Sequence, residues 1–224
     1  FVSAYIEKAK VLEKVKRYNE ALENFRLSIE LSEPNSFVYY RIAKCYIKIN
    51  NKKLFIDFIK KSVREEPGNE KAWIFLIKYY LKNNNFRQAK YLSSKALINN
   101  HNSIKILRLN AIIHKEIGDT REAIKFYNQI LDFKENLSWK IWKGLLKCLI
   151  DNKEWSELLR TSLKAKKHYP NKAFLDFIIS GCLLKNGKIN EAIYFYQSGK
   201  KTCQVPEKLI KYFPEFNENK TLLV

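Results

Sequence analysis

Cysteine side chains are the residues of this chain that could most readily bind a metal or form a covalent bridge. The four cysteines lie far apart in the sequence, at Cys45, Cys148, Cys182 and Cys203, whereas structural zinc sites need close pairs such as C-x2-C. Cys148 and Cys182 are 34 residues apart, and a recurrence of this kind indicates small buried side chains. We therefore predict no metal site and no disulfide.

Catalytic patterns are also missing from the sequence. The three histidines, His101, His114 and His168, stand alone. None of the H-E-x-x-H, G-x-S-x-G or G-x-x-x-x-G-K-[ST] patterns of metalloproteases, hydrolases and nucleotide-binding loops occurs. A general acid and a general base need a shared cleft, and neighbouring carboxylates such as Glu65 and Glu66 look like a solvated helix end. We therefore predict that the chain has no catalytic residue, binds no cofactor and is not an enzyme.

Lysine is the residue type whose abundance could carry function. The chain has 42 Lys and Arg against 23 Asp and Glu, a formal net charge of +19, and such a surface attracts acidic protein segments, nucleic acid or anionic lipid. Only 8 of the 42 basic residues are arginine. Because arginine is preferred for bidentate phosphate contacts, this composition favours an acidic protein partner over nucleic acid.

Targeting signals are absent from the sequence. No apolar run reaches the roughly 18 residues of a membrane span, and the N-terminus carries no secretion signal pattern. The chain begins with Phe1 and contains no Met, so we expect an excised fragment or a chain with its start removed. We expect a cytoplasmic or membrane-associated location, the latter through a segment outside the fragment.

A period of 34 residues organises the chain. Apolar residues recur at spacings of three and four, which is the period of a helix. A repeated helix pair cannot cover its own apolar face, so the units must stack. We therefore expect an all-α array, with Ser138 as a one-residue insertion between the fourth and fifth units. The six units are 2–35, 36–69, 70–103, 104–137, 139–172 and 173–206.

Small or apolar residues mark two places in each unit, where we expect the two helices of a pair to cross closely. The eighth place holds Ala9, Ala43, Ile77, Ala111, Leu146 and Ser180. The twentieth place holds Ala21, Phe55, Ala89, Ala123, Leu158 and Ala192. Asn and Gly fall between the helices, as at Asn50 and Gly118, because these residues tolerate the left-handed backbone that ends a helix.

These units resemble the tetratricopeptide repeat family. The W-x2-L…Y…A pattern of that family is nearly intact in the third unit, at Trp73, Leu76, Tyr80 and Ala89. The resemblance covers residues 2–206 and implies a right-handed superhelical solenoid of six helix-turn-helix repeats. Pentatricopeptide repeats are the nearest rival family. They have a period of 35 residues, whereas consecutive units of this chain keep a period of 34. Of the four tryptophans, Trp139 lies beside the insertion and is the one we expect to be exposed.

The residues after the last unit look like a cover for its apolar edge. Leu209, Ile210 and Phe213 predict a short capping helix over 207–213 that Pro214 ends. We therefore predict a repeat domain over 1–213, with 214–224 as a linker or tail.

The resemblance also implies a binding surface. In this family the first helices line a concave face through the second, fifth, ninth, twelfth and thirteenth places of each repeat. A spacing of four puts two residues on one helical face, so the lysines at the ninth and thirteenth places should form a ladder. The predicted binding residues are Lys10, Lys14, Tyr40, Lys44, Lys48, Lys71, Ile74, Lys78, Lys82, Lys105, Arg108, Lys143 and Lys147.

Two readings of these lysines stay open: a functional basic groove, or the solvated surface of a lysine-rich chain. Some family members clamp a C-terminal carboxylate with an Asn at a place that Lys10 occupies here, so the resemblance does not imply that site.

The function that we predict is a scaffold or adaptor that holds an acidic partner segment in the basic groove. Family analogy suggests a bacterial multi-protein assembly, such as a motor, secretion or envelope apparatus. The alternatives are binding of nucleic acid or another polyanion, and a repeat segment of a larger enzyme with its chemistry elsewhere. The sequence leaves the partner's identity, the compartment and the oligomeric state open.

Overall fold

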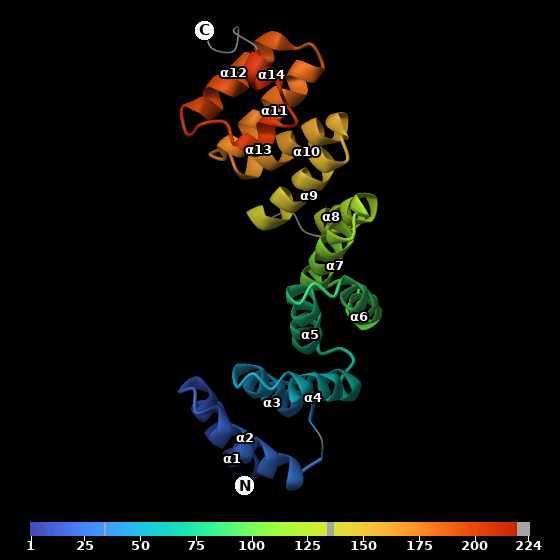
Figure 1. Cartoon of the computed structure of the whole chain (residues 1–224), viewed down its shortest axis with the longest axis vertical. Coiled ribbons are helices and arrows are strands. Elements are labelled where there is room, and N and C mark those ends of the chain that lie inside the picture. The colour runs from blue at the N-terminus through green and yellow to red at the C-terminus, as the bar shows by residue number, and fades with distance from the viewer. Residues whose placement is uncertain (34, 134–136, 219–224) are drawn as a thin grey trace. The chain divides into compact units, whose positions relative to one another are not determined.

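The fold is all-helical, as predicted. The computed structural model describes residues 1–33, 35–133 and 137–218, and every regular element in this part of the chain is a helix (Figure 1). The chain divides into two compact units, Phe1–Ile113 and His114–Val224. The boundary falls inside one helix of the fourth predicted repeat.

Consecutive helices pair within each unit. The first unit contains α1 (Val2–Lys14), α2 (Tyr18–Glu30), α3 (Ser36–Lys48), α4 (Lys52–Glu65), α5 (Glu70–Lys82), α6 (Phe86–Asn99) and most of α7 (Ile104–Glu116). The second unit contains α8 (Thr120–Phe133), α9 (Trp139–Asp151), α10 (Trp155–His168), α11 (Ala173–Lys185), α12 (Ile189–Lys200), α13 (Glu207–Ile210) and α14 (Glu215–Glu218).

The turns between paired helices follow the sequence period. One residue in each turn adopts a left-handed backbone: Lys16, Asn50, Asn84, Gly118, Lys153 and Gly187. These positions are 34 residues apart except across Ser138, where the spacing is 35. The next residue often caps the second helix, because the side chain of Asn51 accepts a hydrogen bond from Leu54 N, and that of Asn85 accepts one from Gln88 N, each at 3.1 Å.

The residues at the two predicted helix-crossing places are completely buried. All twelve residues at the eighth and twentieth places have an exposed fraction of 0%. Phe55, where most units have Ala, is accommodated because its ring packs against the next helix pair, with its centroid 5.3 Å from that of Phe75 and 4.7 Å from that of Tyr79. A larger side chain at this place therefore links neighbouring pairs.

The C-terminal segment, residues 203–218, differs from the predicted cap and tail. The capping helix is shorter than 207–213, and a further helix, α14, follows it. Phe213 is completely buried, and a Cβ on Gly181 of α11 would lie 2.4 Å from its ring. Phe216 is also buried, with its ring 5.6 Å from that of Phe213.

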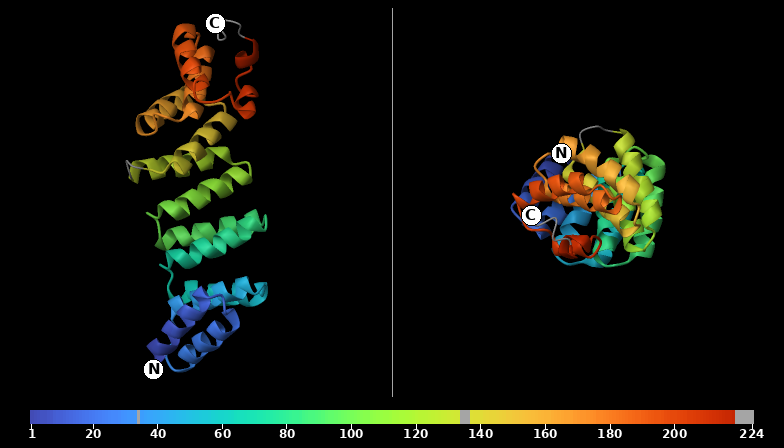
Figure 2. Two further views of the ribbon diagram at one scale, coloured as in Figure 1. Left: turned by 90° about the vertical axis from the view of Figure 1, so that its left-hand side faces the viewer. Right: turned by 90° about the horizontal axis from the view of Figure 1, so that it is seen from above.

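The reason for this difference is that the apolar side chains continue beyond Pro214. α14 contacts α11, and Figure 2 shows the red C-terminal segment lying alongside the orange α11–α12 pair. The short helix ends at Ile210, before Pro214 is reached, and the packed chain continues beyond the proline to Phe216. Residues 219–224 of the predicted tail lie outside the described part of the chain.

Candidate functional site

The predicted binding residues fall into two groups, one in each unit. Eleven of them belong to the first unit, and we call this group the basic face: Lys10, Lys14, Tyr40, Lys44, Lys48, Lys71, Ile74, Lys78, Lys82, Lys105 and Arg108. They come from the first helix of each pair, α1, α3 and α5, and from α7. The ring of Tyr40 lies 6.0 Å from that of Phe75, which joins α3 to α5.

Part of the basic face is already neutralised. Glu13, whose side chain is only 11% exposed, lies 2.7 Å from Lys44 Nζ and 2.9 Å from Arg41 Nε. Lys10 pairs with Glu7 at 2.7 Å. Lys44 thus bridges α3 to α1, a structural contact in addition to its predicted role in binding.

The rest of the basic face carries uncompensated charge. Lys14, Lys48, Lys71, Lys78 and Lys82 are exposed. No ion pair joins any of these five lysines to another described residue. Two apolar side chains of the set, those of Tyr40 and Ile74, are half-buried between the charges. Lys105, by contrast, lies 3.4 Å from Glu70.

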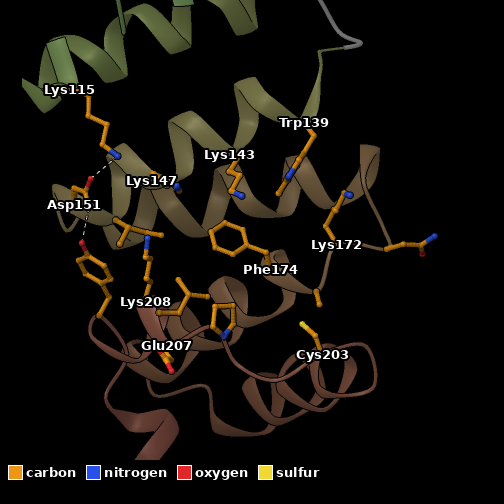
Figure 3. Close-up of a pocket in the computed structure, with 16 residues that line it drawn as sticks. Lys115, Trp139, Lys143, Lys147, Asp151, Lys172, Phe174, Cys203, Glu207 and Lys208 are labelled. Atoms are coloured by element: carbon orange, nitrogen blue, oxygen red, sulfur yellow. Dashed lines mark hydrogen bonds and ion pairs between the residues drawn. The ribbon is translucent and has the colours of Figure 1, made fainter. Parts of the chain in front are cut away.

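The two remaining predicted residues, Lys143 and Lys147, line a pocket in the second unit (Figure 3). They lie four residues apart on α9, so both point from one helical face. The pocket has a volume of about 820 Å³. Its wall also includes side chains from α11 and from the C-terminal segment, namely Phe174, Cys203, Glu207, Lys208 and Tyr212. We call it the α9 pocket.

The charge of the α9 pocket is predominantly positive. Its Asp151 is engaged twice, by Lys115 Nζ at 3.1 Å and by the Tyr212 hydroxyl, which donates a hydrogen bond of 2.8 Å. Burial lowers the pKa of Lys147, and the neighbouring positive charges of Lys143, Lys115 and Lys208 lower it further, against the opposing effect of Asp151. A bound anion would relieve this repulsion.

An aromatic wall adjoins the lysines. The Trp139 ring lies 6.2 Å from that of Phe174 and 5.5 Å from that of Tyr169. Lys172 Nζ stands 5.8 Å from the centre of the Trp139 ring. Trp139 is half-buried, so the expectation that this tryptophan would be exposed is met only in part.

Sequence reasoning missed most of the α9 pocket. Lys115 occupies the twelfth place of its repeat, which is one of the family's groove places, so a signal for it was present. Lys208 and Tyr212 lie beyond the last repeat, where no period can position them. Lys172 is the last residue of its repeat, whereas the predicted binding residues all belong to the first helix of a repeat.

The cysteine and histidine residues for which the sequence predicts no chemistry are mostly buried. Cys45, Cys148 and Cys182 are fully buried, and burial raises the pKa of their thiols to about 12, about 11 and about 12, respectively. His114 is 7% exposed, with Nδ1 3.0 Å from an oxygen of Asp119.

The described residues show neither a candidate metal site nor a candidate membrane span. They include no group of three or more His, Cys, Asp or Glu side chains that could hold a metal ion. None of their helices combines the length and the apolar character that a membrane crossing needs.

Comparison with known sequences matches the first two of the six units. The sequence model of the tetratricopeptide repeat matches residues 2–35 and 38–69. The tetratricopeptide repeat-containing protein trd-1 of Caenorhabditis elegans is 23% identical over 120 residues, which is 54% of this chain and 16% of that protein. This chain therefore spans only a small part of the length of that curated relative.

Solved structures show the same fold at low identity. The C-terminal part of a repeat protein from Cytophaga hutchinsonii has a TM-score of 0.69 at 16% identity, covering 97% of this chain and 90% of that one. Pseudomonas aeruginosa pilF has a TM-score of 0.65 at 12% identity, covering 98% and 97%. YrrB has a TM-score of 0.64 at 14% identity, covering 88% and 94%.

Proposed function

Two repeats match the tetratricopeptide model and the whole described chain shares its fold, and we propose that this chain is a tetratricopeptide repeat protein whose basic face binds an acidic segment of a partner protein. Proteins of this fold generally act as interaction scaffolds and are typically not catalytic. The YrrB structure is described as that of a repeat protein with an unusual peptide-binding site, and a peptide is the kind of ligand that we propose here.

One observation carries this proposal: exposed lysines of α1, α3 and α5 form no ion pair with a described carboxylate, while the nearly buried carboxylate of Glu13 is already occupied. Glu13 is held by Lys44 and Arg41, so it cannot neutralise Lys48, Lys78 or Lys82. A partner carboxylate would remove the repulsion between lysines one helical turn apart, such as Lys78 and Lys82. The half-buried Tyr40 and Ile74 would supply apolar contact between the charges.

The expected mode of binding has two parts. Exposed lysines raise the rate of encounter with an acidic segment but add little net affinity each, because solvent and salt screen them. Apolar side chains between the lysines provide desolvated contact, which resists dissociation. Binding should therefore weaken steadily with rising salt.

The biological setting is a further part of the proposal. We place the scaffold in a bacterial multi-protein assembly, such as a motor, secretion or envelope apparatus. This setting rests on family analogy, and the similar structures from Pseudomonas aeruginosa and Cytophaga hutchinsonii contribute the fold alone.

The test uses a charge-reversal variant that spares the fold. Lys44 is left unchanged because a glutamate there would face Glu13. The variant Lys48→Glu/Lys78→Glu/Lys82→Glu is compared with a control, Lys52→Glu/Lys53→Glu/Lys90→Glu, whose lysines are also exposed but belong to the second helices α4 and α6. Binding of a labelled short peptide rich in Glu and Phe is measured by anisotropy at several salt concentrations.

The expected result is salt-sensitive binding that only the first variant loses. Equal peptide binding by the wild type and the Lys48/Lys78/Lys82 variant, with circular dichroism unchanged, would contradict the proposal. A random single-stranded oligonucleotide is measured in parallel. Tighter binding of the oligonucleotide than of the peptide, lost in the same variant, would favour the polyanion alternative instead.

A further inference from the structure

We propose that the α9 pocket binds a small organic polyphosphate with a flat ring, the chemical class of nucleoside di- and triphosphates. This site is separate from the basic face, and the inference does not depend on the acidic-peptide proposal. It rests on the shape of the pocket, its uncompensated lysines and its aromatic wall.

The C-terminal segment gives the site the size of a small-molecule pocket. Tyr212 bonds to Asp151 at the end of α9, and Phe213 is buried against Gly181. The segment is therefore fixed as a wall. The volume of about 820 Å³ lies within the range of about 300–1,000 Å³ that is common for small ligands.

The arrangement of the lysines favours a compact anion with several charges. Lys143, Lys147, Lys172 and Lys208 line the pocket, and none of them forms an ion pair with a described carboxylate. Asp151 is already engaged by Lys115, which leaves Glu207 as the remaining acidic side chain of the wall. A polyphosphate concentrates its charges within one pocket, whereas a peptide spreads its carboxylates along about 3.3–3.6 Å of chain per residue.

The lysine side chains suit this ligand chemically. Each ammonium group offers three donors with no acceptor, and lysine is a common phosphate ligand as a point charge. The lowered pKa of Lys147 reflects burial and the crowding of Lys143, Lys115 and Lys208, and phosphate oxygens among these groups would offset that repulsion.

Trp139, part of the aromatic wall, lies on the opposite side of the pocket from Lys147 and Lys208. Figure 3 shows Trp139 and Lys172 on one side, Lys147 and Lys208 on the other, and Phe174 and Lys143 between them. A flat heteroaromatic ring can stack on an exposed aromatic face whatever its base identity. The geometry therefore places the ring near Trp139 and Phe174, and the phosphates near Lys147 and Lys208.

The experiment compares three probes by isothermal titration calorimetry: ATP, inorganic tripolyphosphate and adenosine. ATP should bind more tightly than either part alone, because it uses both walls. In Lys147→Ala/Lys208→Ala the affinity for ATP and for tripolyphosphate should fall about tenfold or more. The matched control is Lys200→Ala/Lys201→Ala, exposed lysines of the same unit outside the pocket, which should bind ATP as the wild type does.

A second variant tests the aromatic wall. Trp139→Leu should remove the advantage of ATP over tripolyphosphate while leaving tripolyphosphate binding intact, which also shows that the variant is folded. The inference is overturned if ATP does not bind the wild type, if both double-lysine variants lose ATP equally, or if the glutamate-rich peptide competes for the pocket more strongly than ATP.

The basic-face variant separates the two proposals. Lys48→Glu/Lys78→Glu/Lys82→Glu should bind ATP with unchanged affinity. If it does not, nucleotide binds to the basic face and the assignment of the α9 pocket is wrong.

Discussion

The two units use lysines at the same repeat places for surfaces of different kinds. Lys78 on α5 and Lys147 on α9 both occupy the ninth place of a repeat. Lys78 stands on an open surface, while Lys147 lies in a pocket whose other wall is the C-terminal segment. The repeat fixes where an exposed lysine points, but segments outside the repeat decide whether it stands on an open surface or lines a pocket.

The two units also differ in the role of the carboxylate that pairs with their lysines. Glu13 in the first unit holds two cations and is nearly buried, so it serves the packing of α1 against α3. Asp151 in the second unit is one-third exposed and is shared by Lys115 and Tyr212 at the edge of the pocket. The first carboxylate stabilises the scaffold and the second shapes a site.

The largest effect should come from Phe213→Ala. Removal of a fully buried phenylalanine typically costs about 3–5 kcal/mol, and Phe213 also holds the wall of the α9 pocket against Gly181. We expect the second unit to lose stability by this amount and ATP binding to disappear. Hydrogen exchange resolved by residue, with calorimetry, measures both.

The matched deletion in the first unit is Phe55→Ala, because Phe55 is also completely buried. It should destabilise the first unit by a similar amount and leave ATP binding in place. If Phe213→Ala kept normal exchange and normal ATP binding, the contrast between an open and a walled surface would fail.

Overpacking the helix crossings should have the next largest effect in either unit. Ala89 of α6 and Ala123 of α8 have no exposed surface, so Ala89→Trp and Ala123→Trp should each cost about 1–3 kcal/mol. Lys90→Ala serves as an exposed control and should change little. Chemical denaturation curves that overlay the wild type in both tryptophan variants would refute the repeat register.

A pair of charge reversals should separate structural from exposed lysines of the basic face. Lys44→Glu would bring a second carboxylate to the nearly buried Glu13 and leave it with one cation, costing about 1–3 kcal/mol. Lys48→Glu, on the exposed face one turn later, should cost less than about 0.5 kcal/mol. Equal melting temperatures would show that the Glu13 bridge contributes nothing.

A loss near the lower end of the range for Lys44→Glu should come from Tyr212→Phe. The hydrogen bond to Asp151 raises the pKa of Tyr212 above its ordinary value of 10.0. Because the folded state favours the protonated phenol, this stabilisation is complete below pH 10 and is lost as pH rises through the raised pKa. The variant should lose about 1 kcal/mol at neutral pH, and the difference from wild type should shrink in strongly alkaline buffer.

Much of the fold could be predicted because the repeat is periodic. The small residues at the helix crossings, such as Ala21 and Ala123, and the turn residues, such as Asn50 and Gly118, recur at one spacing and report local geometry directly. The outward position of Lys48 and Lys78 followed from the same register.

The rest depended on contacts that have no period. The ion pair between Lys44 and Glu13 joins two repeats through side chains at different repeat places. Neither repeat contains a sequence signal that predicts it. The burial of Phe216 after Pro214 was hidden because proline marks the end of a helix, not of a packed segment. The α9 pocket exists only where Tyr212 meets Asp151, 61 residues apart in sequence.

The exposed thiol at the edge of the α9 pocket gives this chain a built-in labelling site. Of the four cysteines, three are buried and have strongly raised pKa values, so they hardly form thiolates at neutral pH. Cys203 is exposed and lines the pocket. A maleimide dye added to the folded wild-type protein should therefore attach there, without removal of any other cysteine, and report through its fluorescence when the neighbouring cavity fills.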